Sequence, residues 1–361
     1  MRILYDGHIF RWQRVGGVSR YFHEIISRLP ADWCPTLLGL EALNGHLPAH
    51  SRLKTSLLSS VRPRRFTQPV KRFWWKQSQI KQANLLHPTY YTLSGGLSFS
   101  DFTCPVVITV HDLIAATYPH LEEQADLIFR CQREAILRAD HIICISKATE
   151  RDLLERFPQL ANKITVIHLG ASSPVWSGKE PATVFDPPTF LFVGRRGAYK
   201  NFALAMRAFA KAAEVHSGIR LRVVGEPLSA EERWQLHFLG LSERVDVSEF
   251  PEAEALQELY RRSVALLYPS RHEGFGIPPL EAMACGTLAV TSNTTSLPEV
   301  VGDAGIMLDP GDESAWTECI LQIAHGDVPR EELLERGRRR AAALSWDNSA
   351  QRHVALYKRL A

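Results

Sequence analysis

A buried strand, a glycine-containing turn and a short helix follow one another within residues 264–290, and this succession constrains the fold more than any other segment. The apolar run at 264–268 is typical of a strand that is buried on both faces of a parallel sheet. Pro278 and Pro279 suit the first turn of a helix, where a missing N–H costs nothing. The segment therefore predicts a strand–turn–helix unit whose backbone N–H groups suit a phosphate or a sugar hydroxyl.

Two carboxylates, Glu273 and Glu281, stand at either end of this turn and helix start. Ionised carboxylates accept hydrogen bonds from the hydroxyl groups of a bound ligand. Two cations follow a second apolar run at 190–194: Arg195 brings a planar guanidinium and Lys200 a compact positive charge, and both suit a diphosphate. We interpret these residues together as a candidate nucleotide-sugar site, with a solvated basic turn as the alternative for the two cations.

Apolar runs alternate with helical patterns in both halves of the chain. This predicts an α/β protein of two doubly wound, Rossmann-like domains that face one another across a cleft. Residues 171–188 are rich in Pro and Ser and lack periodicity, so we place the domain boundary there. The expected domains are residues 1–175 and residues 186–345. A terminal amphipathic helix at 346–361 is expected to pack back toward the first domain.

The net charge, the cysteines and the absence of long apolar runs limit the kinds of molecule and membrane that we expect the protein to contact. The 361 residues carry a net charge of +3, which is too small to favour nucleic acid. The six cysteines form no CxxC pair and are expected to be reduced thiols of a cytoplasmic protein. Residues 1–5 predict a strand rather than a signal peptide, and no apolar run approaches the roughly 20 residues that span a bilayer. Any membrane contact is therefore expected to be peripheral.

Residues 62–81 combine Arg and Lys with Phe and Trp, and they contain no Asp or Glu. This pattern is typical of a helix drawn to the anionic inner face of a membrane. The alternative is a basic helix whose aromatic side chains pack inward while its charges are simply solvated. The sequence leaves both interpretations open.

Further candidates lie where turns follow apolar runs in the first half. Gly16 and Gly17 begin a helical pattern, where glycine lets a ligand approach backbone amides, and an ordinary turn is the alternative. His111 follows the run 106–110, at a strand end where ligands gather in open α/β sheets, although a lone histidine is more often structural. No Asp-x-Asp, GxGxxG, P-loop or HExxH motif occurs, so we expect neither an essential metal nor a nicotinamide cofactor.

Taken together, these motifs resemble those of the retaining glycosyltransferases of family 4. The resemblance rests on an E-x7-E set at 273–281, a GR…KN turn at 194–201, a glycine loop at 16–21 and the polar pairs at 111–112 and 146–147. It covers nearly the whole chain, and the N-terminal part looks most like bacterial mannosyltransferases that build polysaccharides. One departure, Glu-Phe-Pro at 249–251 where the family often has a small glycine-containing turn, leaves the nucleotide base open.

The resemblance implies a GT-B fold, with the donor nucleotide on the C-terminal domain and the acceptor on the N-terminal one. It implies transfer with retention at the anomeric carbon and no essential metal. By similarity, the donor is GDP-mannose and the acceptor is a glycan or a lipid-linked sugar. The catalytic residues that it implies are His111, Glu273, Arg195 and Lys200. The donor-binding residues that it implies are Gly17, Gly194, Arg195, Lys200, Gly225, Phe250, Pro251, Glu273, Gly274, Phe275, Gly276, Ile277 and Glu281.

In this implied arrangement, Arg195 and Lys200 hold the diphosphate, Glu281 takes the ribose hydroxyls and His111 lies at the reaction centre. A site rich in cations and amides favours a front-face reaction, in which the departing phosphate accepts the proton of the acceptor. A double displacement would need a carboxylate nucleophile, for which Glu273 is the candidate. Two other hypotheses stay open: a nucleotide-sugar epimerase or hydrolase on the same scaffold, and a non-catalytic sugar-nucleotide-binding protein.

Overall fold

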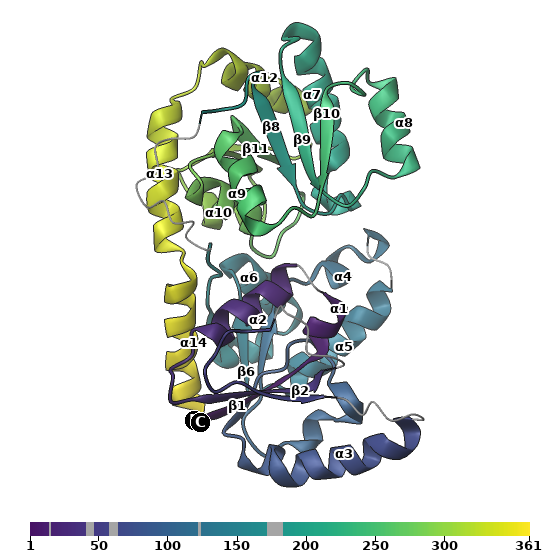
Figure 1. The fold of residues 1–361 in the computed structure, drawn as a ribbon, viewed down its shortest axis with the longest axis vertical. Coiled ribbons are helices and arrows are strands. Elements are labelled where there is room, and N and C mark those ends of the chain that lie inside the picture. The colour runs from purple at the N-terminus through teal and green to yellow at the C-terminus, as the bar shows by residue number, and fades with distance from the viewer. Residues whose placement is uncertain (14–15, 41–46, 58–63, 122–123, 172–182) are drawn as a thin grey trace. The chain divides into compact units, whose positions relative to one another are not determined.

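A computed structural model of the chain describes residues 1–13, 16–40, 47–57, 64–121, 124–171 and 183–361, with only the backbone of residues 64–68 and 198. Within these residues the chain forms two compact units, which we describe separately (Figure 1). Unit 1 comprises Met1–Leu169 and Trp346–Ala361, and unit 2 comprises Gly170–Ser345. Most of the expected Pro- and Ser-rich boundary, residues 172–182, lies outside the described residues.

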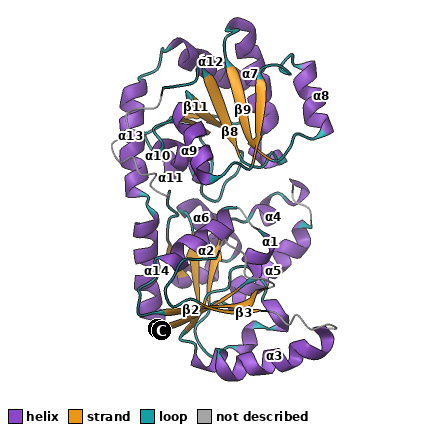
Figure 2. Cartoon of the chain, viewed as in Figure 1, coloured by secondary structure: helices purple, strands orange, loops and turns teal. Residues whose placement is uncertain are grey.

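Unit 1 is built from strands with helices between them (Figure 2). Its strands are β1 (Arg2–Asp6), β2 (Cys34–Leu40), β3 (Lys54–Leu57), β4 (Leu85–Leu86), β5 (Val107–Val110), β6 (His141–Cys144) and β7 (Ile164–Val166). Its α-helices are α1 (His8–Trp12), α2 (Gly17–Ser27), α3 (Arg64–Ser78), α4 (Ile114–Thr117), α5 (Ala125–Arg138), α6 (Lys147–Arg156) and α14 (Trp346–Leu360). Short 3-10 helices span Ile80–Gln82, Ser94–Gly96, Phe99–Asp101, Pro119–Leu121 and Pro158–Lys163.

The strands of unit 1 pair in parallel. One sheet has the order β3-β2-β1-β4 and the other the order β5-β6-β7, and a parallel bridge between Leu86 and Val106 joins them beside β4. In the joined sheet the strand order changes direction between β1 and β4, and we call this place the reversal point of unit 1. Doubly wound α/β folds bind ligands at such a point, outside the carboxyl ends of the strands.

Unit 2 has the same plan. Its strands are β8 (Thr189–Val193), β9 (Arg220–Gly225), β10 (Val245–Glu249), β11 (Ala265–Tyr268), β12 (Leu288–Ser292) and β13 (Ile306–Leu308). Its helices are the 3-10 helix Ala198–Lys200 and the α-helices α7 (Phe202–Val215), α8 (Ala230–Phe238), α9 (Ala253–Arg262), α10 (Ile277–Ala284), α11 (Leu297–Val301), α12 (Glu313–His325) and α13 (Arg330–Ala343). They surround a 6-stranded parallel sheet of order β10-β9-β8-β11-β12-β13, whose reversal point lies between β8 and β11.

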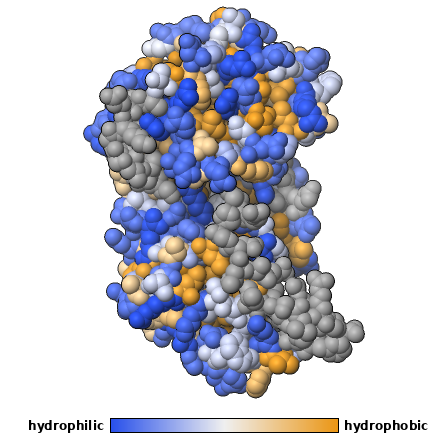
Figure 3. All heavy atoms as spheres, in the orientation of Figure 1, coloured by the Kyte–Doolittle hydropathy of each residue, from blue (hydrophilic) through white to orange (hydrophobic). Residues whose placement is uncertain are grey.

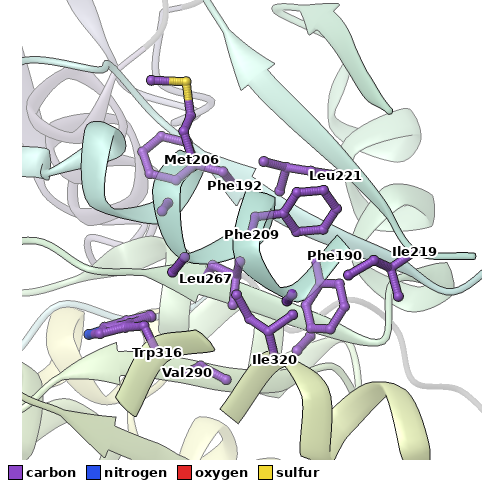
Figure 4. Packing of buried hydrophobic residues seen from close by; sticks show 14 of the residues in the cluster. Phe190, Phe192, Met206, Phe209, Ile219, Leu221, Leu267, Val290, Trp316 and Ile320 are labelled. Carbon is purple, nitrogen blue, oxygen red and sulfur yellow. The ribbon is translucent and has the colours of Figure 1, made fainter. Parts of the chain in front are cut away.

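Alternate residues of β8 face two different hydrophobic clusters of unit 2. Phe190 and Phe192 point to one face, where Phe209 of α7 and Trp316 of α12 pack in the same cluster (Figure 4). The residues between them point to the other face, toward a cluster that includes Tyr260 of α9. Successive side chains of a strand point to opposite faces, so a strand covered on both sides must be apolar throughout. This is why the central strands β8 and β11 read as apolar runs, whereas β10 at the edge of the sheet carries polar residues.

The state of the cysteines and the length of the helices bear on redox chemistry and on membrane crossing. The six cysteines, all among the described residues, form no disulfide with one another, and three of them, Cys144, Cys285 and Cys319, are buried. Within the residues that the structure describes, no helix combines the length and the apolar character needed to cross a membrane.

A chain of hydrogen bonds in the core of unit 1 fixes α14 against α2. His353 of α14 bonds through Nδ1 to the Ser349 carbonyl (2.8 Å) and through Nε2 to the Tyr21 hydroxyl (2.6 Å). Burial lowers the pKa of His353 to about 4, so the imidazole is neutral. Because a carbonyl oxygen only accepts, Nδ1 carries the proton and the Tyr21 hydroxyl donates to Nε2.

The Tyr21–His353 bond determines which atom donates in the remaining hydrogen bonds of this chain. The hydroxyl of Tyr21 has a single hydrogen, so Thr109 of β5 donates to its oxygen (2.8 Å). His87 then donates to Thr109 through Nε2 (2.8 Å) and accepts at Nδ1 from Tyr357 of α14 (2.6 Å). Burial also holds the pKa of His87 well below its usual value. The chain is therefore satisfied with both histidines neutral, and α14 is tied to β5 as well as to α2.

We expect acid to weaken unit 1, because its buried histidines resist protonation. Unfolded histidine takes up a proton near pH 6.5, whereas folded His353 does so only near pH 4. Its contribution to stability is therefore fully present above about pH 6.5 and is lost as the pH falls toward 4. The loss from this one residue is about 2 kcal/mol at a pH of about 5. Urea unfolding at about pH 7 and about pH 5 measures it.

The matched variant is His353→Gln. It should be less stable than the wild type near neutral pH, but it should lose about 2 kcal/mol less on acidification because the titrating group is gone. Burial raises the pKa of Asp6 to about 6, so its contribution to the free energy of unfolding changes with pH in the opposite direction. That contribution is the same in both proteins and cancels when their acid losses are compared. Equal acid losses in the two proteins would contradict this account.

Candidate functional site

The loops that follow β8 and β11 meet at the reversal point of unit 2. The two strands pair in parallel, so their carboxyl ends lie at the same edge of the sheet. The backbone N–H of Arg271, after β11, donates to the Tyr199 carbonyl, after β8 (2.7 Å). This bond joins the predicted cation loop to the predicted E-x7-E segment. Both motifs therefore belong to the edge where doubly wound folds bind ligands.

The ammonium group of Lys200 lies between these loops. It donates to Glu273 Oε1 (2.6 Å) and to the Tyr268 hydroxyl (3.0 Å). Its Nζ is also 5.2 Å from the ring centroids of both Tyr199 and Tyr268. The side chains of Lys200 and Glu273 are only 14% and 10% exposed, so each charge depends on the other. The structure thus brings two of the predicted catalytic residues together.

Asn201, which follows Lys200 directly, fixes the position of this lysine. It has a φ of +56°, a left-handed conformation that asparagine tolerates better than most residues. Its amide nitrogen donates to the carbonyls of Pro269 (3.1 Å) and Pro310 (2.8 Å). These partners lie 68 and 109 residues away in the sequence, so the motif that contains Asn201 gave no sign of this cross-link.

Two hydroxyl side chains hold the backbone that carries Glu273. The single hydroxyl hydrogen of Ser296 is shared between the carbonyls of Glu273 (2.9 Å) and Phe275 (2.8 Å), and Thr295 accepts from the Glu273 N–H (3.1 Å). We did not predict either hydroxyl, and only their position in a Thr- and Ser-rich turn after an apolar run marks them in the sequence. The Glu273 carboxylate therefore stands on a turn that is fixed from two sides.

The start of α10 has an unusual set of amide donors. Gly276 precedes the helix with a φ of +112°, and a Cβ there would lie 2.8 Å from Leu297 Cδ2, so no side chain fits without a shift. The helix begins at Ile277, followed by Pro278 and Pro279, which have no N–H. Any backbone amide that this helix start offers to a ligand must therefore belong to Ile277 or to the glycine turn before it.

Glu281 lies on α10 and is half-buried. Its Oε2 accepts a hydrogen bond from the hydroxyl of Tyr260 on α9 (3.1 Å). Burial, reinforced by the Glu281 carboxylate, holds the pKa of Tyr260 well above its usual value, so the phenol stays protonated. A carboxylate has several lone pairs, and Glu281 can therefore accept further hydrogen bonds from a ligand.

The ends of β9 and β10 place three predicted residues side by side. Gly225 pairs with Glu249, the last residue of β10, and Phe250 and Pro251 follow directly. Gly225 has a φ of +153°, and a Cβ there would lie 2.6 Å from the Gly194 carbonyl oxygen. Phe250 is 59% exposed and has a φ of +39°. This edge therefore presents an aromatic ring beside two closely approaching glycine backbones.

The two arginines after β8 differ in environment. The side chain of Arg195 is 75% exposed, with its Nε 3.7 Å from Glu226. The side chain of Arg196 is 5% exposed and donates to Glu232 (2.7 Å) and to the carbonyls of Glu226 and Pro227 (2.8 Å each). Arg196 is therefore structural, whereas Arg195 is accessible to an anionic ligand. The sequence alone does not show which of these two adjacent arginines is exposed and which is buried.

Unit 1 holds the two remaining predicted residues, Gly17 and His111. Gly17 is the exposed first residue of α2, and Tyr21 of the same helix packs edge-on against His111, with ring centroids 5.1 Å apart and planes at 85°. Burial lowers the pKa of His111 to about 4, so its imidazole is neutral. Its Nε2 has no hydrogen-bond partner among the described residues. A neutral imidazole nitrogen can serve a hydroxyl group as donor or acceptor.

The chemistry of the unit 2 edge suits an anionic, hydroxyl-rich ligand. It combines an ammonium group, an exposed guanidinium, two carboxylates and amides at a helix start, which bind phosphate oxygens and hydroxyls. In the part of the chain that the structure describes, no group of three or more His, Cys, Asp or Glu side chains is arranged to hold a metal ion.

Comparison with solved structures defines the class of fold. Sucrose-phosphate synthase from Thermosynechococcus elongatus matches with a TM-score of 0.75 at 21% sequence identity, over 100% of this chain and 99% of that one. Together with the two parallel, doubly wound sheets, this likeness identifies the α/β GT-B fold with two Rossmann-like domains. The predicted fold class is confirmed.

The chain belongs to the glycosyltransferases of group 1 and family 4, as the motifs predict. Residues 179–340 match the family Glycosyl transferases group 1, and residues 15–172 match Glycosyltransferase Family 4. The chain is similar to the O-antigen chain mannosyltransferase B of Escherichia coli, with 31% identity over 269 residues and 70% of each chain. It is also similar to a D-inositol 3-phosphate glycosyltransferase of Corynebacterium jeikeium (strain K411), with 30% identity over 304 residues, 77% of this chain and 72% of that one.

Proposed function

We propose that the protein is a retaining, metal-independent hexosyltransferase that moves mannose from GDP-mannose to a glycan or lipid-linked acceptor in surface polysaccharide synthesis. The observation that carries the proposal is the ion pair of Lys200 and Glu273 at the reversal point of unit 2. It holds a cation beside the start of α10, and a departing diphosphate is stabilised by such fixed charges and amides. The similarity to an O-antigen chain mannosyltransferase supports mannose as the sugar.

In this proposal the donor lies along the carboxyl edge of the unit 2 sheet. Lys200 and Arg195 stabilise the negative charge of the diphosphate, which grows as the sugar leaves. Glu281 accepts hydrogen bonds from the ribose hydroxyls with the lone pairs that Tyr260 does not use. The exposed ring of Phe250 stacks on the base, beside the glycine backbones at the ends of β8 and β9.

The transfer then takes place on one face of the sugar. The bond between the anomeric carbon and the diphosphate oxygen breaks, and the acceptor hydroxyl oxygen bonds to the same face. The hydroxyl proton passes to the departing phosphate oxygen, so the protein need not supply a strong base. A neutral His111 agrees with this scheme, because it can orient a hydroxyl group without taking its proton.

We expect Lys200→Ala and Glu281→Ala each to lower the rate of mannose transfer at least ~10²-fold, because one removes charge stabilisation and the other ligand positioning. Initial rates with GDP-mannose and an oligosaccharide acceptor measure the effect. Lys211 of α7 is the control, since its side chain is 57% exposed and pairs with Glu313, and neither residue belongs to the proposed site. Lys211→Ala should transfer at the wild-type rate. Wild-type rates in the Lys200→Ala and Glu281→Ala variants would remove the site assignment.

The donor, the stereochemistry and the metal requirement are tested with the wild-type protein. A thermal-shift screen of nucleotide sugars should single out GDP-mannose, because a ligand that binds only the folded state raises the melting temperature. The first product, examined by NMR, should keep the anomeric configuration of the donor. Transfer should continue in excess EDTA. A different preferred nucleotide sugar would overturn the donor, and an inverted product or loss of activity in chelator would overturn the mechanism.

We also propose that unit 1 contacts an anionic membrane surface through α3. Val70, Phe73 and Trp74 lie on one side of this helix and are 70%, 65% and 52% exposed. Trp75 is buried instead, and its indole N–H donates to the Ser56 hydroxyl (2.8 Å). Trp75 therefore packs inward, whereas Phe73 and Trp74 form an exposed aromatic face. In Figure 3, hydrophobic atoms appear at the lower end of the drawn face, where Figure 1 shows α3.

Charged side chains flank this exposed face. Arg72 and Lys76 both contact Asp101 (2.9 and 2.5 Å), so part of their charge is compensated. Lys71 lies with its Nζ 6.0 Å from the Trp75 ring. Residues 62–63 of the predicted basic stretch lie outside the described residues. Aromatic and aliphatic groups beside cations suit the interface of an anionic bilayer.

We expect the double substitution Phe73→Ser and Trp74→Ser to weaken binding to phosphatidylglycerol vesicles about tenfold or more, because two apolar anchors are lost. Vesicle co-sedimentation measures the affinity. Trp234 and Phe238 of α8 form a matched control, since they are a second pair of aromatic side chains on one helix and are 64% and 76% exposed. Their replacement by Ser should leave binding unchanged. Equal binding by wild type and the α3 variant would contradict the membrane proposal.

A further inference from the structure

Hydrogen bonds also join the loops at the reversal point of unit 1. Asp6, which ends β1, accepts hydrogen bonds from the N–H (2.6 Å) and the hydroxyl (2.9 Å) of Thr89, in the loop after β4. Its other carboxylate oxygen accepts from the His8 N–H (3.3 Å) and lies 3.5 Å from the Ser94 hydroxyl. The carboxylate is thus occupied by the protein, and it locks together the two loops that frame this reversal point.

An exposed tryptophan stands on these locked loops. Trp12, the last residue of α1, is 62% exposed. Its ring meets the His8 ring edge-on, with centroids 4.1 Å apart and planes at 86°. It also meets the Tyr90 ring, with centroids 5.2 Å apart and planes at 67°. Two neighbours therefore fix the orientation of a large aromatic side chain that still has most of its surface in water. The ring therefore offers a fixed apolar face that a ligand can cover.

His8 adds a polar group to this aromatic cluster. It is 8% exposed, and its Nε2 has no hydrogen-bond partner among the described residues, while its Nδ1 lies 3.3 Å from the Thr92 hydroxyl. Burial, with a contribution from Arg11, lowers the pKa of His8 to about 4, so the ring is neutral. A buried polar atom without a partner is costly, and a ligand hydroxyl would satisfy it as donor or acceptor.

The cluster continues to the predicted reaction centre. Tyr90 contacts Tyr91, with ring centroids 5.1 Å apart, and the Tyr91 hydroxyl accepts from the backbone N–H of His111 (3.5 Å). Trp12, Tyr90 and His111 follow three strands, β1, β4 and β5, that are neighbours in the joined sheet. A ligand that rests on Trp12 therefore lies on the same edge of unit 1 as His111.

We propose that Trp12, with Tyr90 and His8, forms a platform that binds a pyranose ring of the acceptor glycan. A pyranose has a face of C–H groups, which suits an aromatic ring, and a rim of hydroxyls, which suits the Nε2 of His8. The proposal rests on the proposed function, because only a glycosyl transfer gives an acceptor sugar a place beside His111. It goes beyond that function in naming the residues that select a sugar ring rather than another hydroxyl compound.

The test compares Trp12→Ala, Trp12→Phe and Trp234→Ala in the full chain. Trp234 of unit 2 is the matched control because it is 64% exposed, close to the 62% of Trp12. Binding of α-linked mannotriose, followed by saturation-transfer NMR without any donor, should weaken about tenfold in Trp12→Ala, the usual effect of removing one aromatic anchor. Trp12→Phe should restore most of the affinity, and Trp234→Ala should match the wild type.

Transfer kinetics give the second readout. In Trp12→Ala the KM for the acceptor should rise about tenfold, while the KM for GDP-mannose stays at the wild-type value. Undiminished mannotriose binding in Trp12→Ala, or no binding by the wild type, would overturn the platform even where transfer occurs. Absence of transfer from GDP-mannose with intact, Trp12-dependent glycan binding would instead overturn the proposed donor and leave the platform standing.

Discussion

The ion pair between Lys200 and Glu273 joins the loops on either side of the reversal point of unit 2. Both side chains are largely buried, so neither charge is tolerable without the other, and the loops are held in the one arrangement that keeps them in contact. The cross-link by Asn201 and the hydroxyl of Ser296 maintain that arrangement from both sides. A positive charge is thereby fixed before any ligand arrives, and such preorganised charge is what stabilises a leaving group without reorganisation at the moment of reaction.

The two units share one strand order but present different chemistry at their reversal points. In unit 2 the loops carry cations, carboxylates and a helix start, which suit a charged diphosphate. In unit 1 the carboxylate of Asp6 is used to hold the loops, and beside it stand the exposed aromatic ring of Trp12 and the buried, neutral imidazole of His8. These suit a neutral sugar. Any difference in what the two units bind therefore lies in the side chains at the strand ends, since the backbone plan is the same.

Sequence patterns predict much of this fold. The strands β8 and β11 follow from the rule that buried parallel strands are apolar throughout, and α10 follows because Pro278 and Pro279 suit the first turn of a helix. The strand β2, Cys34–Leu40, escaped prediction because it contains Pro35 and Gly39, which normally argue against a strand inside a sheet. Sequence motifs predict only part of the candidate site. Cations, glutamates and glycines are visible as motifs, whereas the separation of Arg195 from its buried neighbour depends on partners far away in the sequence.

The hydrogen-bonded core of unit 1 bears directly on the role of His111. Tyr21 packs against the His111 ring, but its only hydroxyl hydrogen is committed to His353, and its oxygen already accepts from Thr109. Tyr21 therefore packs against the His111 ring without satisfying the imidazole. Among the described residues nothing else bonds to Nε2 of His111, which is neutral because burial lowers its pKa to about 4. A neutral nitrogen left in this state can donate a hydrogen bond to a ligand hydroxyl or accept one from it. The helix α14, from the far end of the chain, contributes to this state because His353 engages the Tyr21 hydroxyl.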